Sequence, residues 1–301
     1  MKCLVTGGAG FIGNNLVNRL INDGHEVIII DNLSTGKKEN INSEAKFYHV
    51  DISLLRRKTD FSMFEGVDVV FHLAALARVQ PSIENPISFH ETNVNGTLNL
   101  LNACIIHGVK RFVYSSSSSV YGDVEQLPTS ENHKLNPMSP YALQKLIGEQ
   151  YCKLYSELYN LETVSLRYFN VYGDGMSLEG AYKLVIPIFT EQKLNGEPMT
   201  IRGDGEQRRD FTYVGDVVDA NIKCMDYPLE LNGDIFNIGN GNNRSVNDIA
   251  NMIGGERVHI DPVIEPRETL ADNKNAELRL NWKPTIEIED WMKIYKKNMG
   301  F

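Results

Sequence analysis

Tyr141 and Lys145 stand four residues apart in the stretch SPYALQK, and Pro140 directly before them favours the start of a helix. Residues at positions i and i+4 share one face of a helix, so the ammonium group can lie near the phenol. A free tyrosine, with a pKa of about 10, is a poor base at neutral pH, but a neighbouring positive charge favours the phenolate and lowers that pKa. On its own the pair is a weak indication of a proton-transferring tyrosine, because the same spacing is common by chance in helices.

A run of five serines, Ser115 to Ser119, is followed by VYGD. Serine-rich stretches are commonly flexible linkers. This run, however, continues the apolar stretch RFVYS (111–115), which is typical of a buried strand. We therefore expect the serines to form the strand end and the turn after it. A hydroxyl at the carboxyl end of a parallel strand faces the crevice where ligands bind.

The stretch TGGAGFIG places glycines at positions 7, 10 and 13, after a predicted strand and before a predicted helix. Glycines permit a tight turn and let pyrophosphate oxygens approach the backbone N–H groups at the helix N-terminus. In this strand–turn–helix context the pattern predicts a dinucleotide-binding loop. The expected contacts are Gly7, Gly10, Phe11, Ile12 and Gly13.

Asp31 ends the next predicted strand, eighteen residues after the last of these glycines. A carboxylate there would accept hydrogen bonds from the adenosine ribose and repel a 2′-phosphate, which favours NAD over NADP. Lys37 and Lys38 nearby keep NADP open as an alternative. Asp51 follows another predicted strand end, where we expect it to meet the adenine amino group.

Apolar runs alternate with amphipathic stretches through the first half of the chain, which predicts an α/β fold with a parallel sheet covered on both faces. The expected strands are residues 2–6, 26–30, 47–50, 67–73, 111–115 and 164–169. After about residue 170, Gly, Pro, Asn and Asp become frequent, which indicates a smaller lobe. We expect a Rossmann-like doubly wound sheet in residues 1–170 and a smaller, interleaved α+β lobe in residues 171–301, with segments around 210–240 returning to the main domain.

The composition is that of a soluble globular protein, with 301 residues, 42% hydrophobic and 23% charged. A net charge of −9 argues against a nucleic-acid or membrane partner. The four cysteines are scattered, which argues against structural zinc and a disulfide framework. The N-terminus leaves no room for a signal peptide and no apolar run reaches the ~18 residues of a membrane span, so we expect a cytoplasmic protein.

Several stretches together carry a family resemblance. They are GGAGFIG (7–13), HLAA (72–75), NVNGT (93–97), SSSSSVYGD (115–123), SPYALQK (139–145), LRYFNVYG (166–173) and GDGEQRRDFTYV (203–214). In this order, over nearly the whole chain, they resemble the extended short-chain dehydrogenases that act on nucleotide sugars, above all the UDP-hexose 4-epimerases. The resemblance implies NAD held tightly by the first domain, a UDP-sugar bound mainly by the second lobe, and a homodimer formed by the helices near 93–107 and 151–160.

The resemblance also implies a set of site residues. It places the catalytic hydroxyl four residues before Tyr121, at Ser117, and makes Tyr141 and Lys145 its partners. The further implied cofactor contacts are Asn32, Ser34, Ile52, Leu73, Ala74, Ala75, Asn93, Ser115 and Tyr168, together with Tyr141 and Lys145. The implied substrate contacts are Ser117, Asn170, Leu184, Val185, Thr200, Arg209, Arg267 and Thr269.

Ser118 and Ser119 discriminate between the reactions of this family. Relatives that dehydrate sugar nucleotides resemble TDEVYG here, and those that decarboxylate similarly carry a glutamate. Without a carboxylate, elimination would lack its acid and base. Transient oxidation at carbon 4, with hydride returned to the opposite face, is then the expected reaction. The alternatives are a nucleotide-sugar dehydrogenase or reductase that releases its cofactor, and a non-catalytic NAD-sensing protein, against which the intact Ser117, Tyr141 and Lys145 argue.

The resemblance assigns the nucleotide end of the substrate as well. Asn170 is similar to an asparagine that contacts the phosphates, Arg209 to an arginine that pairs with the pyrophosphate, and Thr200 to a residue that cradles uracil. The stretch GAYKLVIP (180–187), with Leu184 and Val185, resembles relatives that accept N-acetylated sugars.

The loop 262–272 is shorter than is usual in the family, so Arg267 either contacts phosphate from a new register or pairs with a carboxylate. Thr269, at the position of a gate residue, leaves room for a 2-acetamido group, which favours a dual or N-acetyl substrate. Arg208 is expected to be a surface charge. His72 follows buried apolar residues and is expected to be a core histidine with its hydrogen bonds satisfied.

Overall fold

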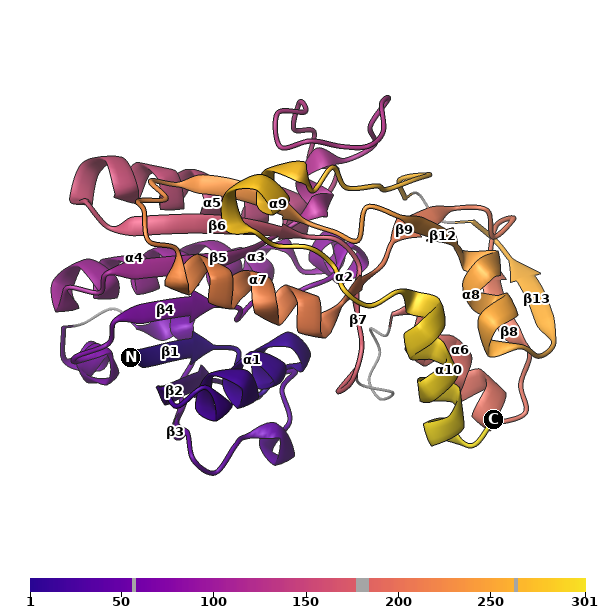
Figure 1. Ribbon diagram of the computed structural model, residues 1–301, viewed down its shortest axis with the longest axis horizontal. Coiled ribbons are helices and arrows are strands. Elements are labelled where there is room, and N and C mark those ends of the chain that lie inside the picture. Colours follow the sequence, from indigo (N-terminus) through magenta and orange to yellow (C-terminus); the bar gives the residue numbers. More distant parts are fainter. Residues whose placement is uncertain (56–57, 177–183, 263–264) are drawn as a thin grey trace.

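A seven-stranded parallel sheet with helices on both faces dominates the computed structural model, which describes residues 1–55, 58–176, 184–262 and 265–301 (Figure 1). In sheet order the strands are β11 (Asp234–Ile238), β6 (Glu162–Tyr168), β5 (Arg111–Ser117), β4 (Val69–His72), β1 (Lys2–Thr6), β2 (Glu26–Asp31) and β3 (Lys46–His49). The chain crosses from one side of β1 to the other between β3 and β4, as in a doubly wound sheet. The predicted Rossmann-like fold is confirmed.

Alternate residues of β1 show how the sheet is covered. Cys3 and Val5 enter a core shared with the helices on one face, whereas Leu4 enters the core on the other face. Both sides of the strand are thus apolar, as expected for a buried parallel sheet. The helices are α1 (Phe11–Asn22), α7 (Val214–Asp226) and α9 (Lys274–Leu280) on the first face, and α4 (Gly96–His107) and α5 (Pro140–Tyr159) on the second (Figure 1).

The smaller lobe has its own core, in which Phe189, Ile249 and Trp291 are buried. Its helices are α6 (Val185–Leu194), α8 (Val246–Ile253) and α10 (Ile288–Met299), which lie beside one another at the right of Figure 1. Its strands pair two by two: β8 (Met199–Arg202) with β13 (Arg257–Ile260), β9 (Arg208–Asp210) with β12 (Asn243–Ser245), and β7 (Val171–Tyr172) with β10 (Thr212–Tyr213). Helix α7 nevertheless packs on one face of the main sheet, and β11 is an edge strand of that sheet. The chain therefore passes between the two lobes more than once.

Short helical segments complete the fold. They are α2 (Val79–Glu84), α3 (Pro86–His90), a π-helical turn (Glu91–Asn95) that leads into α4, and 3₁₀ turns at Lys38–Asn40, Ile52–Leu54, Lys58–Phe64 and Ser118–Tyr121. The four cysteines are buried as free thiols. In the described ranges, none of the helices combines the length and apolarity that crossing a membrane requires.

Candidate active site

The glycine loop lies where β1 passes into α1. Gly7 has φ +73°, and a Cβ atom there would lie 2.7 Å from the backbone nitrogen of Ala74. A Cβ on Gly13 would lie 2.1 Å from the carbonyl oxygen of Gly7. No side chain other than hydrogen fits at either position, so backbone alone forms the cradle beside the first turn of the helix. Gly10 is the N-cap of α1 and has no side chain that could cap the helix, so this helix end suits a phosphate group.

Asp31 ties this loop to the end of β2. Its carboxylate accepts hydrogen bonds from the backbone N–H groups of Ala9 (3.0 Å) and Leu33 (2.8 Å). The predicted ribose partner thus lies at the rim of the glycine cradle and also fixes its shape. The donor set and the cradle together fit the adenosine diphosphate half of NAD.

Asp51 follows the end of the next strand and contacts Asn32, the residue after Asp31. It accepts hydrogen bonds from the hydroxyl (2.6 Å) and the backbone N–H (2.8 Å) of Ser53 and from the side-chain amide of Asn32 (3.0 Å). Burial alone would raise the pKa of Asp51, but these bonds bring the pKa below its ordinary value. Ser34 joins the same rim, since its backbone N–H donates to Asn32, while Ile52 is buried beneath it.

The segment after β4 closes the other side of the cradle. Ala74 donates its backbone N–H to the Thr6 hydroxyl at 3.2 Å, and Leu73 donates to the Thr6 carbonyl oxygen at 3.2 Å. His72 is 2% exposed and hydrogen-bonds at 2.8 Å to the hydroxyls of both Thr6 and Thr97, which confirms the predicted core histidine. Burial places the pKa of His72 well below its usual value, so the ring is neutral.

The side chain of Asn93 anchors the segment that follows β4, from Ala75 onward. Its amide bonds both the backbone N–H and the carbonyl oxygen of Leu76 at 2.9 Å and donates to Gln144 at 3.0 Å. The residue is 2% exposed, and each of these bonds is internal. Asn93 therefore links α5 to the loop that borders the predicted cofactor site.

The serine run forms the end of β5 and a 3₁₀ turn, so the prediction that it is not a linker is confirmed. Its hydroxyls point to different partners. Ser115 bonds the Tyr168 hydroxyl at 3.1 Å, and Ser116 donates to the buried carboxylate of Glu149. Ser117 accepts the backbone N–H of Ser119 at 3.2 Å and lies near enough to Tyr141 to lower the pKa of its phenol.

Helix α5 begins at Pro140, as predicted, and presents Tyr141 and Lys145 to the end of β5. Ser139 caps the helix by accepting the Ala142 backbone N–H at 3.1 Å. The Lys145 ammonium donates to the Ser115 carbonyl oxygen at 2.7 Å and lies 6.0 Å from the centre of the Tyr141 ring. The structure thus brings Ser117, Tyr141 and Lys145 together at one point.

The pKa of Tyr141 differs from the expectation that Lys145 would lower it. Burial raises this pKa above its ordinary value, and nearby Ser117 and the charge of Arg78 oppose that rise only in part. Burial also lowers the pKa of Lys145 to about 8. Desolvation therefore sets the direction of both pKa shifts, which residue spacing does not reveal.

Arg78 is a residue that the sequence analysis missed. It has φ +126°, a conformation that costs a non-glycine residue roughly 1–3 kcal/mol. It directly precedes α2, and Ser82 of this helix accepts the Tyr141 backbone N–H at 3.1 Å. Strained residues of this kind cluster at functional sites, but a positive φ at an arginine leaves no signal in the sequence.

Glu149 and Arg167 form a second missed feature beneath the site. Arg167 donates to both carboxylate oxygens of Glu149, at 2.9 and 2.7 Å, and to the Tyr121 hydroxyl at 2.8 Å. Both side chains of the ion pair are almost wholly buried. Glu149 follows Lys145 by one helical turn, a spacing that could have pointed to it.

The predicted substrate residues lie in and next to the smaller lobe. Arg209 pairs with Glu265 at 2.6 Å, and Arg267 makes two 2.9 Å bonds to Asp204, so each arginine has a carboxylate partner. Arg267 is exposed, and its backbone carbonyl accepts the Arg208 N–H at 3.0 Å. The two predicted phosphate arginines thus lie on adjacent segments.

The remaining substrate residues occupy element ends. Thr269 accepts the Asp210 backbone N–H at 3.2 Å, and Thr200 in β8 bonds the Gln192 side chain at 2.8 Å. Asn170 follows β6, and its carbonyl oxygen accepts the Thr212 N–H at 3.1 Å. Leu184 and Val185 stand at the start of α6, whereas residues 180–183 of the stretch GAYKLVIP lie outside the described residues.

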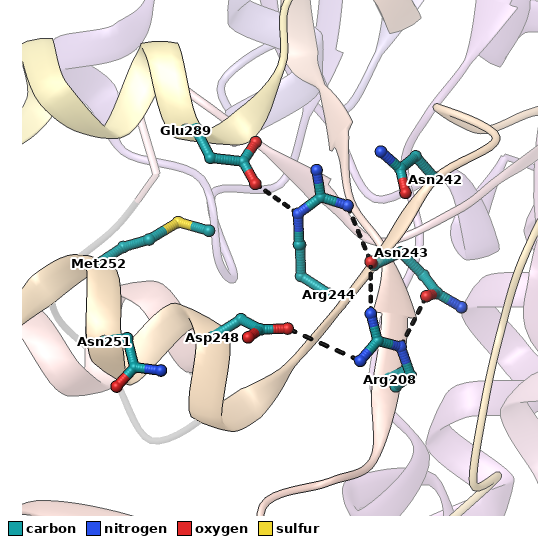
Figure 2. Close-up of a pocket in the computed structure, with 8 residues that line it drawn as sticks. All are labelled: Arg208, Asn242, Asn243, Arg244, Asp248, Asn251, Met252 and Glu289. Atoms are coloured by element: carbon teal, nitrogen blue, oxygen red, sulfur yellow. Dashed lines mark hydrogen bonds and ion pairs between the residues drawn. The ribbon is translucent and has the colours of Figure 1, made fainter.

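Arg208 is partly exposed, as expected of a surface charge, but it also makes contacts that join three elements. It donates to the side-chain and backbone oxygens of Asn243 at 2.8 and 3.0 Å and pairs with Asp248 at 3.7 Å, which joins β9 to β12 and α8. It lines a pocket of about 430 Å³ in which Arg244 also pairs with Glu289 (Figure 2). Because each arginine faces a carboxylate, this pocket has a balanced charge, and it contains none of the predicted site residues. Among the described residues, no cluster of His, Cys, Asp and Glu is arranged to hold a metal ion.

Comparison with known proteins places this geometry in a family. The family model described as NAD dependent epimerase/dehydratase matches residues 3–239. A putative UDP-glucose 4-epimerase of Methanocaldococcus jannaschii is 43% identical over 96% of this chain and 95% of its own length.

Solved structures are similar over nearly the whole chain as well. UDP-glucose 4-epimerase of Thermotoga maritima, crystallised with UDP-glucose, superposes with a TM-score of 0.93 at 39% identity, covering 99% of this chain and 98% of that one. UDP-N-acetylglucosamine 4-epimerase of Methanobrevibacter ruminantium, in complex with UDP-N-acetylmuramic acid, gives a TM-score of 0.91 at 36% identity, covering 98% and 97%. The chain therefore belongs to the NAD-dependent epimerase/dehydratase family.

Proposed function

We propose that this protein is a UDP-hexose 4-epimerase that retains its NAD throughout the cycle. The observation that carries the proposal is the meeting of Ser117, Tyr141 and Lys145 at the carboxyl end of β5, next to the glycine cradle. The absence of a carboxylate at Ser118 and Ser119 favours epimerisation over dehydration or decarboxylation. The relatives named 4-epimerases support the same reaction.

The proposed role of Tyr141 is to accept the proton of the sugar 4-hydroxyl and later to return it. Ser117, which lowers the pKa of the phenol, would hold the same sugar oxygen and complete the proton path. Bound NAD supplies a hydride acceptor for carbon 4 and, in its reduced form, a donor. The 4-keto sugar must rotate between the two hydride transfers, so that each face of carbon 4 is presented once to the nicotinamide.

The proposed role of Lys145 is to supply positive charge, and it exchanges no proton with the substrate. Its ammonium is held by the Ser115 carbonyl oxygen, and it lies close enough to the phenol ring to favour the developing phenolate. The raised pKa of Tyr141 makes this assistance necessary, together with the charge of Arg78. We assign the proton transfer to Tyr141 and the electrostatic support to the two cations.

The proposed division of labour follows the two lobes. Residues 1–170 would hold NAD and the reacting sugar carbon, and residues 171–301 would mainly hold the UDP moiety through Asn170 at the border, Thr200 and Arg209. We further propose that the protein is a homodimer that associates through α4 and α5. The 2-substituent of the sugar would lie toward Thr269, whose small side chain leaves room for an acetamido group.

Proton NMR of the purified protein with UDP-galactose, and separately with UDP-N-acetylgalactosamine, tests the proposal without added cofactor. Formation of the corresponding gluco sugar would require both 4-epimerisation and NAD already bound. The ratio of the two rates reports on the space beside Thr269. Conversion of neither sugar, with or without added NAD, would exclude both as substrates and favour a dehydrogenase or a sensor, while release of NADH during turnover would indicate a dehydrogenase.

A further inference from the structure

The carboxylate of Asp210, the last residue of β9, accepts three backbone N–H groups. They belong to Asn240 (2.7 Å), Gly241 (3.0 Å) and Ala271 (2.9 Å). Asp210 is 0% exposed, so the carboxylate is closed off from any bound substrate. Burial raises its pKa to about 6 while the three N–H groups oppose the rise, and the carboxylate is therefore charged at neutral pH. A buried charge of this kind is retained only where several donors hold it.

The three N–H groups come from two segments that are distant in the chain. Two of them lie in the connection between β11 and β12, whereas Ala271 belongs to residues 269–272, which we call the crosspiece. The segments are closely packed, since a Cβ atom on Gly239 would lie 2.3 Å from the Cβ of Ala271 and 3.0 Å from a carboxylate oxygen of Asp210. Asp210 therefore fastens the crosspiece and the β11–β12 connection to the end of β9.

Two of the predicted substrate residues lie directly against this joint. Arg209 precedes Asp210 in β9, and the Thr269 hydroxyl accepts the Asp210 backbone N–H at 3.2 Å. The Thr269 N–H in turn donates to the Arg208 carbonyl oxygen at 3.1 Å, so the crosspiece runs beside β9. The arginine proposed for the diphosphate and the threonine proposed for the sugar therefore share one backbone register.

The crosspiece is also bonded toward the turn that follows β5. The Leu270 carbonyl oxygen accepts the Thr129 N–H at 2.7 Å, and the Asp272 N–H donates to the Thr129 carbonyl oxygen at 2.9 Å. Asn237 donates to the same Thr129 oxygen at 2.9 Å and accepts the Tyr121 hydroxyl at 2.6 Å. Tyr121 ends the 3₁₀ turn after β5, so these bonds link the predicted nucleotide end of the site to its reacting end.

We propose that Asp210 is a positioning residue that keeps Arg209 and Thr269 in register; this inference rests on the proposed function, in which these two residues hold the UDP-sugar. Asp210 does not itself touch the substrate and acts through the backbone of β9 and the crosspiece. An asparagine has the same shape but only one acceptor oxygen, and its NH₂ group would face at least one of the three N–H donors. Because a buried donor without an acceptor is unfavourable, the backbone around it must shift, and Arg209 and Thr269 move with it.

Isothermal titration calorimetry with UDP tests this role in the wild-type holoenzyme, Asp210→Asn and Asp216→Asn. Asp216, at the start of α7, is the matched control. It is also a buried carboxylate, but it accepts the hydroxyl (2.6 Å) and the backbone N–H (3.0 Å) of Thr285 instead of fastening the crosspiece. Urea denaturation gives the stability of each protein, and chromatography of the released nucleotide gives its NAD content.

Asp210→Asn is expected to raise the Kd for UDP by about 10-fold and Asp216→Asn by less than about 2-fold, with the NAD content unchanged in both. The KM for UDP-galactose should rise with the Kd, and KM should change more than kcat. Unchanged UDP affinity in folded Asp210→Asn would overturn the proposal. An equal loss of affinity in both variants would overturn it as well, because the effect would then follow from lost stability.

Thr269→Val provides a second test should Asp210→Asn fail to fold. It removes the hydroxyl that accepts the Asp210 N–H, and UDP has no sugar for this side chain to contact, so a loss of UDP affinity reports on the register. A loss of about 3-fold is expected, and none would overturn the proposal. Wild-type protein that binds UDP without epimerising either UDP-sugar would refute the proposed reaction alone. Wild-type protein that binds no UDP would overturn the role of Asp210 as well.

Discussion

The ammonium nitrogen of Lys145 donates a 2.7 Å hydrogen bond to the carbonyl oxygen of Ser115, which connects helix α5 to the strand that carries the serine run. This contact is direct, whereas the Tyr141 ring centre lies 6.0 Å away. Lys145 is 4% exposed, and burial lowers its pKa from 10.5 to about 8. Lys145 is therefore a buried connection between α5 and β5, and the folded state disfavours its positive charge.

Replacing Lys145 with Met should change the pH dependence of stability. Between pH 8 and 10.5 the unfolded chain keeps a proton on Lys145 that the folded chain releases, so this residue's contribution to stability rises with pH across that window. Below pH 8 both states are protonated, and the burial of charge is fully unfavourable. The unfolding free energy of Lys145→Met minus that of wild type should thus fall by about 2 kcal/mol from pH 7 to pH 10. Urea titrations at several pH values measure it, and a constant difference would contradict the assigned pKa.

Replacing Tyr141 with Phe should lower kcat by about 10³-fold while NAD stays bound, because the proton acceptor is lost and the ring is kept. Ser117→Ala should lower kcat by about 10²-fold, since Ser117 lowers the pKa of the phenol and is proposed to hold the sugar oxygen. Tyr159→Phe, at the exposed end of α5, is the matched control. Epimerisation assays with measured NAD content give these values, and an active Tyr141→Phe protein would remove the tyrosine from the mechanism.

Patterns that are local in sequence predicted much of this molecule. The glycine loop, the strand that ends in serines and the start of α5 at Pro140 each depend on residues within one turn or one strand. The alternation of apolar strands with helices likewise predicted the doubly wound sheet, because a parallel sheet requires a crossover after every strand. These features could be read without any knowledge of tertiary contacts.

Features that depend on burial or on distant partners could not be predicted in the same way. The pKa of Tyr141 rises because of desolvation, and the spacing of Tyr141 and Lys145 carries no information about that. Arg167 and Glu149 belong to different elements, and Arg209 finds Glu265 across 56 residues of chain. Partner choice of this kind is set by the fold as a whole.

Breaking the buried pair by Glu149→Gln should destabilise the protein by about 3–5 kcal/mol, because the Arg167 charge would remain buried without its counter-ion. The double variant Glu149→Leu/Arg167→Met should cost less than the single one, since no unpaired charge is left. Chemical denaturation of the three proteins tests this. A double variant that is less stable than Glu149→Gln would show that the hydrogen bonds of the pair matter more than its charge balance.

Replacing Asp31 with Ala should lower NAD content by about 10-fold, since it removes the predicted ribose acceptor and the anchor of the Ala9 N–H. The loss should be smaller for NADP, because the carboxylate that would repel a 2′-phosphate is gone. Asp23→Asn, in an exposed pair with Arg19, is the control for loss of one negative charge. The affinities follow from titration of the nucleotide-free protein, and an unchanged preference for NAD would assign the discrimination to other residues.

Helices α4 and α5 expose apolar side chains that the proposed homodimer would bury. Leu154 and Leu158 of α5 lie one turn apart and are 42% and 63% exposed, and Ile106 of α4 is 43% exposed. Leu158→Glu places a charge in this surface, and desolvating it on association is unfavourable, so the dimer should dissociate to the monomer mass. Leu278→Glu is the matched control, because Leu278 is 83% exposed on α9, which covers the opposite face of the sheet.

Light scattering coupled to gel filtration distinguishes the outcomes. Wild type and Leu278→Glu are expected at twice the chain mass of 34.0 kDa, and Leu158→Glu at that mass itself. Because the active-site residues of α5 lie in its first two turns and Leu158 in its last, the monomeric variant should keep its NAD and its activity. A monomeric wild type would refute the dimer, whereas a dimer that persists in Leu158→Glu would place the interface on a different surface.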